Sequence, residues 1–168
     1  MKTEIKNIIL LILFIILQVI WFNHILLFGR YTPIVYIYPI LLLSLEKNET
    51  FNLLFAFVLG ISVDLLSNTG GVFAATAVAI AYFRKIYFLI IKNPSQNLES
   101  IQINKISSLQ RITYYFIFII FSQLLIYLLE SLSFSMVFQK FILILINSFI
   151  TLFIFLIIDL FVINNSEN

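Results

Sequence analysis

The sequence predicts an all-α integral membrane protein, built as a bundle of six transmembrane helices. The chain of 168 residues is 62% hydrophobic and only 11% charged, which leaves too little polar surface to cover a soluble domain. Its mean hydropathy is +1.09. Apolar runs recur along the whole chain with short polar patches between them, and a spanning helix needs only about 20 such residues. These observations leave room for five or six spans and for little else.

The expected spans form a single transmembrane domain over residues 1–168. We expect the first span to stay uncleaved, because its apolar run is too long for a signal peptide and no small-residue cleavage site follows. Pro33 suits the first turn of the second span, while Pro39 should kink that short span or confine it to a tilted or re-entrant path. The spans cover residues 8–28, 33–45, 51–66, 72–91, 112–129 and 141–163, with a polar loop at 92–111.

The distribution of basic residues predicts the orientation of the bundle. With six spans, eight of the ten Lys and Arg residues fall on the side of the N-terminus, and only Arg30 and Lys140 fall on the other side. Basic loops favour the cytoplasm. Both termini and the loop at 92–111 are therefore expected to be cytoplasmic, and this loop could form a short amphipathic helix or be disordered. The eight residues are Lys2, Lys6, Lys47, Arg84, Lys85, Lys92, Lys105 and Arg111.

Several classes of chemistry find no support in the sequence. The chain has no cysteine and a single histidine, His24, so disulfides, Cys-based zinc sites and multi-histidine metal sites are excluded. There is no Gly-rich phosphate loop, no HExxH pair and no nucleophile elbow. We therefore expect no enzymatic activity and no cofactor. The net charge of +2 is the small excess that orients a membrane protein, and it indicates no nucleic-acid partner.

Residues 60–71, "GISVDLLSNTGG", place a carboxylate near the outer end of the third span. Helical spacing puts Gly60, Ser67 and Asn68 on the same face as Asp64, and Gly71 belongs to the turn that follows. A carboxylate within a span is costly and prefers a partner. Two interpretations remain open here: Asp64 contacts a partner specifically, or it is a solvated acid or a cap for the first amides of the fourth span.

The fourth span carries the strongest signal for close helix packing. Ala75 with Ala79, and Ala77 with Ala81, form pairs of small residues spaced by four, which let another helix backbone approach closely. This span is therefore expected at the centre of the bundle.

Polar residues in the other spans suggest further contacts. Gln18 and Gln123 are expected to form interhelical hydrogen bonds within the bundle. Asn23 and His24 lie beside Trp21 at the expected outer interface, where the histidine is either simply wetted or part of a pH-sensitive contact. Asn147 and Thr151 share one face of the sixth span.

Residues 55–85, "FAFVLGISVDLLSNTGGVFAATAVAIAYFRK", resemble the central signature of the rod-shape-determining MreD family. That signature is an apolar helix with a glycine, an Asp-Leu-hydrophobic-Ser run, a glycine-containing turn, and a small-residue helix ending in Ala-Tyr. Weaker matches are "LQVIWFNHILLFG", with Gln18 and Asn23, and "TPIVYIYPILLL", with Pro33 and Tyr36. Pro39 departs from the pattern, and the second half of the chain matches only in length and hydropathy. The matching positions of the signature are Gly60, Asp64, Leu65, Leu66, Ser67, Gly71, Ala81 and Tyr82.

The resemblance implies a non-enzymatic scaffold in the bacterial inner membrane that serves the cell-elongation machinery, or elongasome. Its fold would be similar to the six-helix substrate-binding subunits of energy-coupling-factor transporters. Surrounded by membrane lipid, it would bind a bitopic MreC-like partner and, through it, the MreB filament and the peptidoglycan polymerase-transpeptidase pair. The sequence leaves open whether the chain also forms a homodimer.

Two other functions remain alternatives. A substrate-binding subunit of a vitamin transporter would have a similar length and span count, and its cavity would be lined by Asn23, His24, Asp64, Asn68 and Gln123. An ion-coupled carrier could use Asp64. That second alternative is disfavoured because a proton relay needs further acids at mid-membrane depth, whereas Glu130 and Asp159 are expected near helix ends.

Overall fold

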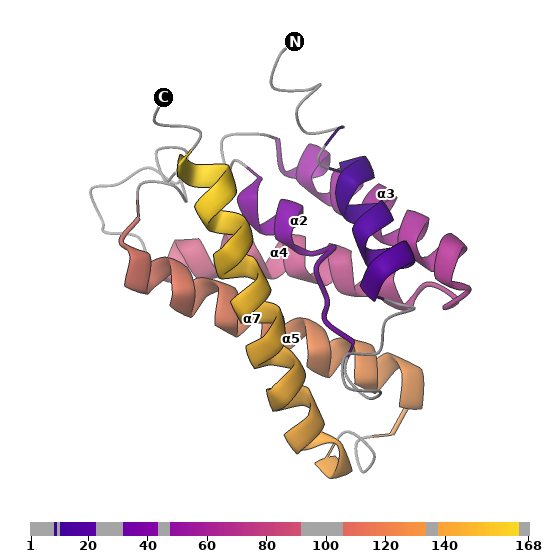
Figure 1. Cartoon of the computed structure of the whole chain (residues 1–168). Coiled ribbons are helices and arrows are strands. Elements are labelled where there is room, and N and C mark those ends of the chain that lie inside the picture. Colours follow the sequence, from indigo (N-terminus) through magenta and orange to yellow (C-terminus); the bar gives the residue numbers. More distant parts are fainter. Residues whose placement is uncertain are drawn as a thin grey trace.

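The computed structural model describes residues 9, 11–22, 32–43, 48–91, 106–133 and 138–164. All regular elements in these residues are helices (Figure 1), which confirms the all-α prediction for this part of the chain. Four of the helices, α3, α4, α5 and α7, are long and apolar enough to cross a membrane. The elements are the π-helix η1 (Leu17–Phe22), which continues a helical run from Leu11, and the α-helices α2 (Tyr38–Leu42), α3 (Glu49–Ser67), α4 (Val72–Ile91), α5 (Ser108–Ser131) and α7 (Phe141–Asn164).

Local signals in the sequence fix where two of the long helices begin. The side chain of Asn48 accepts a hydrogen bond from the Thr50 amide at 3.3 Å and thereby caps the start of α3. Ser107 and Gln110 form a reciprocal capping box at the start of α5. The polar loop expected at 92–111 therefore ends earlier than predicted, because this capping box starts the helix at Ser108; residues 92–105 lie outside the described part.

The long helices pack in sequence order around a buried aromatic core (Figure 1). α3 packs along α4, α4 also contacts α2 and α5, and α7 lies across α5. In the core, the ring of Tyr38 lies 5.0 Å from that of Phe155 and 5.3 Å from that of Phe14. α4 thus has the central position that its alanine content predicted.

The segment of residues 32–43 differs from the helix expected at 33–45. Residues 32–37 are non-helical, and only the five residues of α2 are helical. The expectation that Pro33 opens a helix is wrong, because Pro39 occupies the first turn of α2 instead. Proline has no amide hydrogen and its ring clashes with the carbonyl four residues earlier, so a helix can start at Pro39 but cannot run through it undisturbed. Residues 33–41 are all buried, so this irregular backbone is surrounded by protein.

Candidate functional site

Asp64 lies in the last turn of α3, and its carboxylate caps the N-terminus of α4. The Phe73 amide donates to Oδ1 at 3.1 Å, and the Ala74 amide donates to Oδ2 at 2.7 Å. The Thr69 hydroxyl donates to Oδ1 at 2.5 Å. Asp64 is only 3% exposed, and a negative charge is stabilised by the free amides and the dipole at the start of a helix. Of the two open interpretations, this geometry supports capping, and it adds Thr69, which the sequence analysis did not single out.

The turn between α3 and α4 has three residues in the left-handed region: Asn68, Gly70 and Gly71. Asn68 has φ 55° and its amide donates to the Asp64 carbonyl, which ends α3. Gly70 and Gly71 follow with φ 67° and 96°, as expected of glycines that supply positive φ in a tight turn. Ser67 precedes the turn and lines the pocket described below.

Gly60 brings the backbones of α3 and α4 into direct contact. A Cβ atom at this position would lie 2.5 Å from the Ala74 Cα and 2.7 Å from the Phe73 carbonyl oxygen. These are the neighbours of the amides that Asp64 binds, and both are backbone atoms that cannot rotate away. Gly60 and Asp64, one turn apart, therefore hold the first turn of α4 from the same face of α3.

The Asp64→Leu variant is expected to lose about 2 kcal/mol or more of the free energy of unfolding. Two buried amides and one hydroxyl would lose their acceptor, and a lost helix cap alone costs roughly 0.5–2 kcal/mol. Asp64→Asn, which keeps one acceptor oxygen, should lose less than Asp64→Leu. Unfolding by sodium dodecyl sulfate in mixed micelles, followed by circular dichroism, would measure both losses. Equal stability of Asp64→Leu and the wild type would contradict the capping role.

The two alanine pairs of α4 face different surroundings. Ala75 is exposed and Ala79 partly so, and this pair lies on the outward surface of α4 within the described residues. Ala77 is fully buried. The close helix approach predicted for α4 is made by Ala74, opposite Gly60, rather than by the Ala75 and Ala79 pair. The contact between Ala74 and Gly60 fixes the rotation of α4 about its axis, and Ala75 and Ala79 then point away from α3.

Gln18 holds the irregular segment that contains Pro33. Its Oε1 accepts hydrogen bonds from the amides of Val35 at 2.7 Å and Tyr36 at 3.2 Å, and its Nε2 donates to the Pro33 carbonyl at 3.3 Å. From the other side, the Ile34 amide donates to Thr151 Oγ1 at 3.2 Å. These side chains replace the hydrogen bonds that a helix would supply, and so allow non-helical backbone inside the bundle. Asn23 and His24 lie outside the described residues.

A buried ion pair anchors the same segment at its other end. The Arg111 Nε lies 2.9 Å from Asp159 Oδ2, and the hydroxyls of Tyr38 and Tyr115 donate to Asp159 Oδ1 at 2.6 and 3.0 Å. Asp159 is 5% exposed. Its carboxylate therefore links the short helix α2 to α5 and α7 through one charged, hydrogen-bonded centre.

Arg84 hydrogen-bonds the C-terminal end of α2, and this residue is almost completely buried, at 2% exposed. Its guanidinium donates to the carbonyl of Ile40 and, at 2.6 Å, to that of Leu43. The Tyr114 hydroxyl donates to the Leu41 carbonyl at 3.1 Å. Carbonyls at the C-terminus of a helix lack internal partners and attract a positive charge, so Arg84 satisfies them directly.

Sequence reasoning missed the roles of Arg84 and Asp159. The sequence pattern placed Arg84 among the basic residues of the expected cytoplasmic side and Asp159 near a helix end. The available signal was that Arg111 and Asp159 stand at the same end of consecutive spans, where opposite charges can meet. Pro39, which predicted an irregular segment, also implied that buried donors and acceptors must come from elsewhere to satisfy that backbone.

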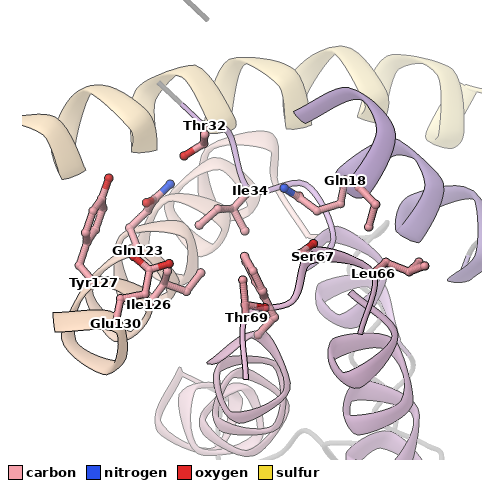
Figure 2. A pocket seen from close by; sticks show the side chains of 12 residues that line it. Gln18, Thr32, Ile34, Leu66, Ser67, Thr69, Gln123, Ile126, Tyr127 and Glu130 are labelled. Atoms are coloured by element: carbon pink, nitrogen blue, oxygen red, sulfur yellow. The ribbon is translucent and has the colours of Figure 1, made fainter. Parts of the chain in front are cut away.

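A pocket of about 350 Å³ opens at the end of the bundle where α3 ends and α4 begins. Figure 2 shows residues of α5 along one wall and Gln18, Leu66 and Ser67 along the opposite wall. Of the five residues expected to line a cavity, Gln123 does so, while Asp64 and Asn68 are not among the lining residues. The lining consists of Gln18, Val19, Thr32, Ile34, Leu66, Ser67, Thr69, Phe73, Gln123, Ile126, Tyr127 and Glu130.

Two buried polar atoms at or next to this pocket have no hydrogen-bond partner among the residues that the structure describes. Gln123 is 2% exposed, and its Nε2 is buried without an acceptor. Asn147 donates from Nδ2 to the Tyr127 hydroxyl at 3.4 Å, while its own Oδ1 has no donor. Buried polar groups are rarely left unsatisfied, so this wall requires an explanation beyond packing. The described residues contain no group of three or more His, Cys, Asp or Glu side chains that could hold a metal ion.

Taken together, the apolar helices and the buried polar centres define a helical membrane protein whose irregular second segment is held by side chains. No protein-family model, curated protein or solved structure matches the chain.

Proposed function

We propose that the protein is a non-enzymatic scaffold of the bacterial cell-elongation complex, related to the MreD family. The proposal rests on the resemblance of residues 55–85 to that family's signature. One structural observation supports it: Gly60, Asp64 and Gly71, three positions of the signature, meet at a single corner between α3 and α4. A set of residues that forms one packing unit is a stronger basis for a resemblance than a set of scattered apolar matches.

The chemistry of that corner also favours a scaffold over an ion carrier. A carrier would need the Asp64 carboxylate to bind and release an ion or proton during transport. Here two backbone amides and the Thr69 hydroxyl occupy the carboxylate, so releasing it would open the start of α4. We propose that the bundle lies in the inner membrane with cytoplasmic termini and a fold like that of energy-coupling-factor binding subunits. In this arrangement it holds a bitopic MreC-like partner, while the chemistry of wall synthesis belongs to the associated enzymes.

Affinity purification from native membranes, with identification of the bound proteins, tests this proposal. The tagged chain should recover a bitopic MreC-like protein, and its depletion in a rod-shaped host should turn rods into spheres. Ala75→Val adds bulk on the exposed surface of α4 and should still fold. Loss of the MreC-like protein from the purification of this variant would place the partner contact on this face of α4. Depleted cells that remain rods, or a purification without any such partner, would overturn the proposal.

A further inference from the structure

We propose that the pocket between α3, α4, α5 and the segment before α2 is a binding site for an uncharged, amide-bearing small molecule. Its volume of about 350 Å³ lies within the range of roughly 300–1,000 Å³ that is typical of ligand sites. Five lining residues are apolar, and the other seven carry polar side chains that converge from separate elements (Figure 2). This inference goes beyond the scaffold function, and it can fail or hold independently of it.

One stripe of α5 forms the polar wall of the site. Gln123, Ile126, Tyr127 and Glu130 follow the helical spacing that puts side chains on one face, and all four line the pocket. Gln123 and Glu130 are two turns apart, a rise of about 10 Å along the helix. Glu130 is exposed near the end of α5, whereas Gln123 is buried. The wall therefore presents a deep amide and an outer carboxylate.

The unpartnered Nε2 of Gln123 determines what the deep end would accept. It is a donor with no acceptor in the described part of the chain, so a carbonyl or a similar oxygen on the ligand would satisfy it. The last torsion of a glutamine side chain is broad, so the amide of Gln123 can turn toward a ligand in the pocket that it lines. At the outer end, Glu130 can accept a hydrogen bond from an N–H of the same ligand. A molecule with both a carbonyl and an N–H group matches these two needs.

The charges around the pocket favour an uncharged ligand. Among the lining residues that the structure describes there is no Lys or Arg, so none of them would offset the charge of a carboxylate or phosphate. Glu130 is the one charged residue in the described lining, and the charge of Lys140 acts on it. The Lys140 Nζ also lies 5.1 Å from the centre of the Tyr127 ring, so the aromatic face already has a cation.

Three indoles of nearly the same size and different charge test the site: indole-3-acetamide, indole-3-acetate and tryptamine. Wild-type protein in phosphatidylcholine nanodiscs would be dialysed to equilibrium against each probe, with protein-free nanodiscs subtracted. We expect the uncharged amide to bind at one site per chain, at least about tenfold more tightly than either charged probe. Equal or tighter binding of a charged probe, or no binding above the protein-free nanodiscs, would overturn the proposal.

Two variants locate the binding within the pocket. Gln123→Met keeps the side-chain volume but removes the donor, and it should weaken indole-3-acetamide binding by about tenfold, as expected for one lost hydrogen bond in a buried site. Leu66→Trp, at an exposed lining position, should block binding even if Gln123→Met does not fold. Gln139→Met, the same change at an exposed position outside the lining, should bind like the wild type. Unchanged affinity in both pocket variants would show that the probe binds elsewhere and would refute the site.

Discussion

Asp159→Leu is expected to lower the free energy of unfolding by about 3–5 kcal/mol, the largest loss for any single change discussed here. The substitution leaves Arg111 facing a buried apolar group, and it removes the acceptor shared by the hydroxyls of Tyr38 and Tyr115. Since Tyr38 belongs to α2, the loss should loosen the irregular segment first. Hydrogen exchange of the residues around α2, together with unfolding in mixed micelles, would measure the local and global effects.

Two comparisons separate the buried charge from general damage to the helix. The double variant Arg111→Leu with Asp159→Leu removes both charges, so it should lose less than the sum of the single losses. Glu49→Gln breaks the ion pair between Glu49 and Lys85, whose side chains are 42% and 43% exposed, respectively. This change should lower the free energy of unfolding by at most about 1 kcal/mol. Similar losses for Asp159→Leu and Glu49→Gln would contradict the anchoring role of Asp159.

Gly60→Ala is expected to destabilise the protein by about 2 kcal/mol, although alanine is the better helix former. In an unconstrained helix the same change would stabilise by roughly 1 kcal/mol. Here the new methyl group would lie 2.5 Å from the Ala74 Cα and 2.7 Å from the Phe73 carbonyl oxygen, so α3 and α4 must separate. Overpacking of a close-packed contact typically costs about 1–3 kcal/mol, and separation also weakens the Asp64 cap.

The sign of the Gly60 effect makes it a decisive measurement. Ala75→Val adds two carbons on the outward surface of α4, and it should change stability by less than about 0.5 kcal/mol, as surface substitutions usually do. Unfolding of Gly60→Ala, Ala75→Val and wild type in the same mixed micelles gives the comparison. A Gly60→Ala protein as stable as the wild type would mean that the two helix backbones are not in contact at this position.

Much of the helical architecture followed from the sequence because its signals are local. Apolar runs of spanning length placed α3, α4 and α7 within a few residues of their observed bounds. The tight turn after Asn68 was also predictable from its glycines, since left-handed backbone strongly favours glycine. The second span was expected to be a short helix that Pro39 disturbs, but only Tyr38–Leu42 is helical. Its actual path depends on hydrogen bonds from Gln18 and Thr151, which lie far away in the sequence.

The candidate sites divide in the same way. The sequence alone determined that Gly60 and Asp64 lie on one face of a helix near a turn, because helical spacing and turn composition need no other information. Only the tertiary structure decided that Asp64 caps α4, that Asp159 pairs with Arg111, and that Gln123 borders a pocket. The reason is physical: a charge or amide in the bundle is satisfied by whichever helix packs against it. That choice is fixed by packing between distant segments, and no local pattern carries it.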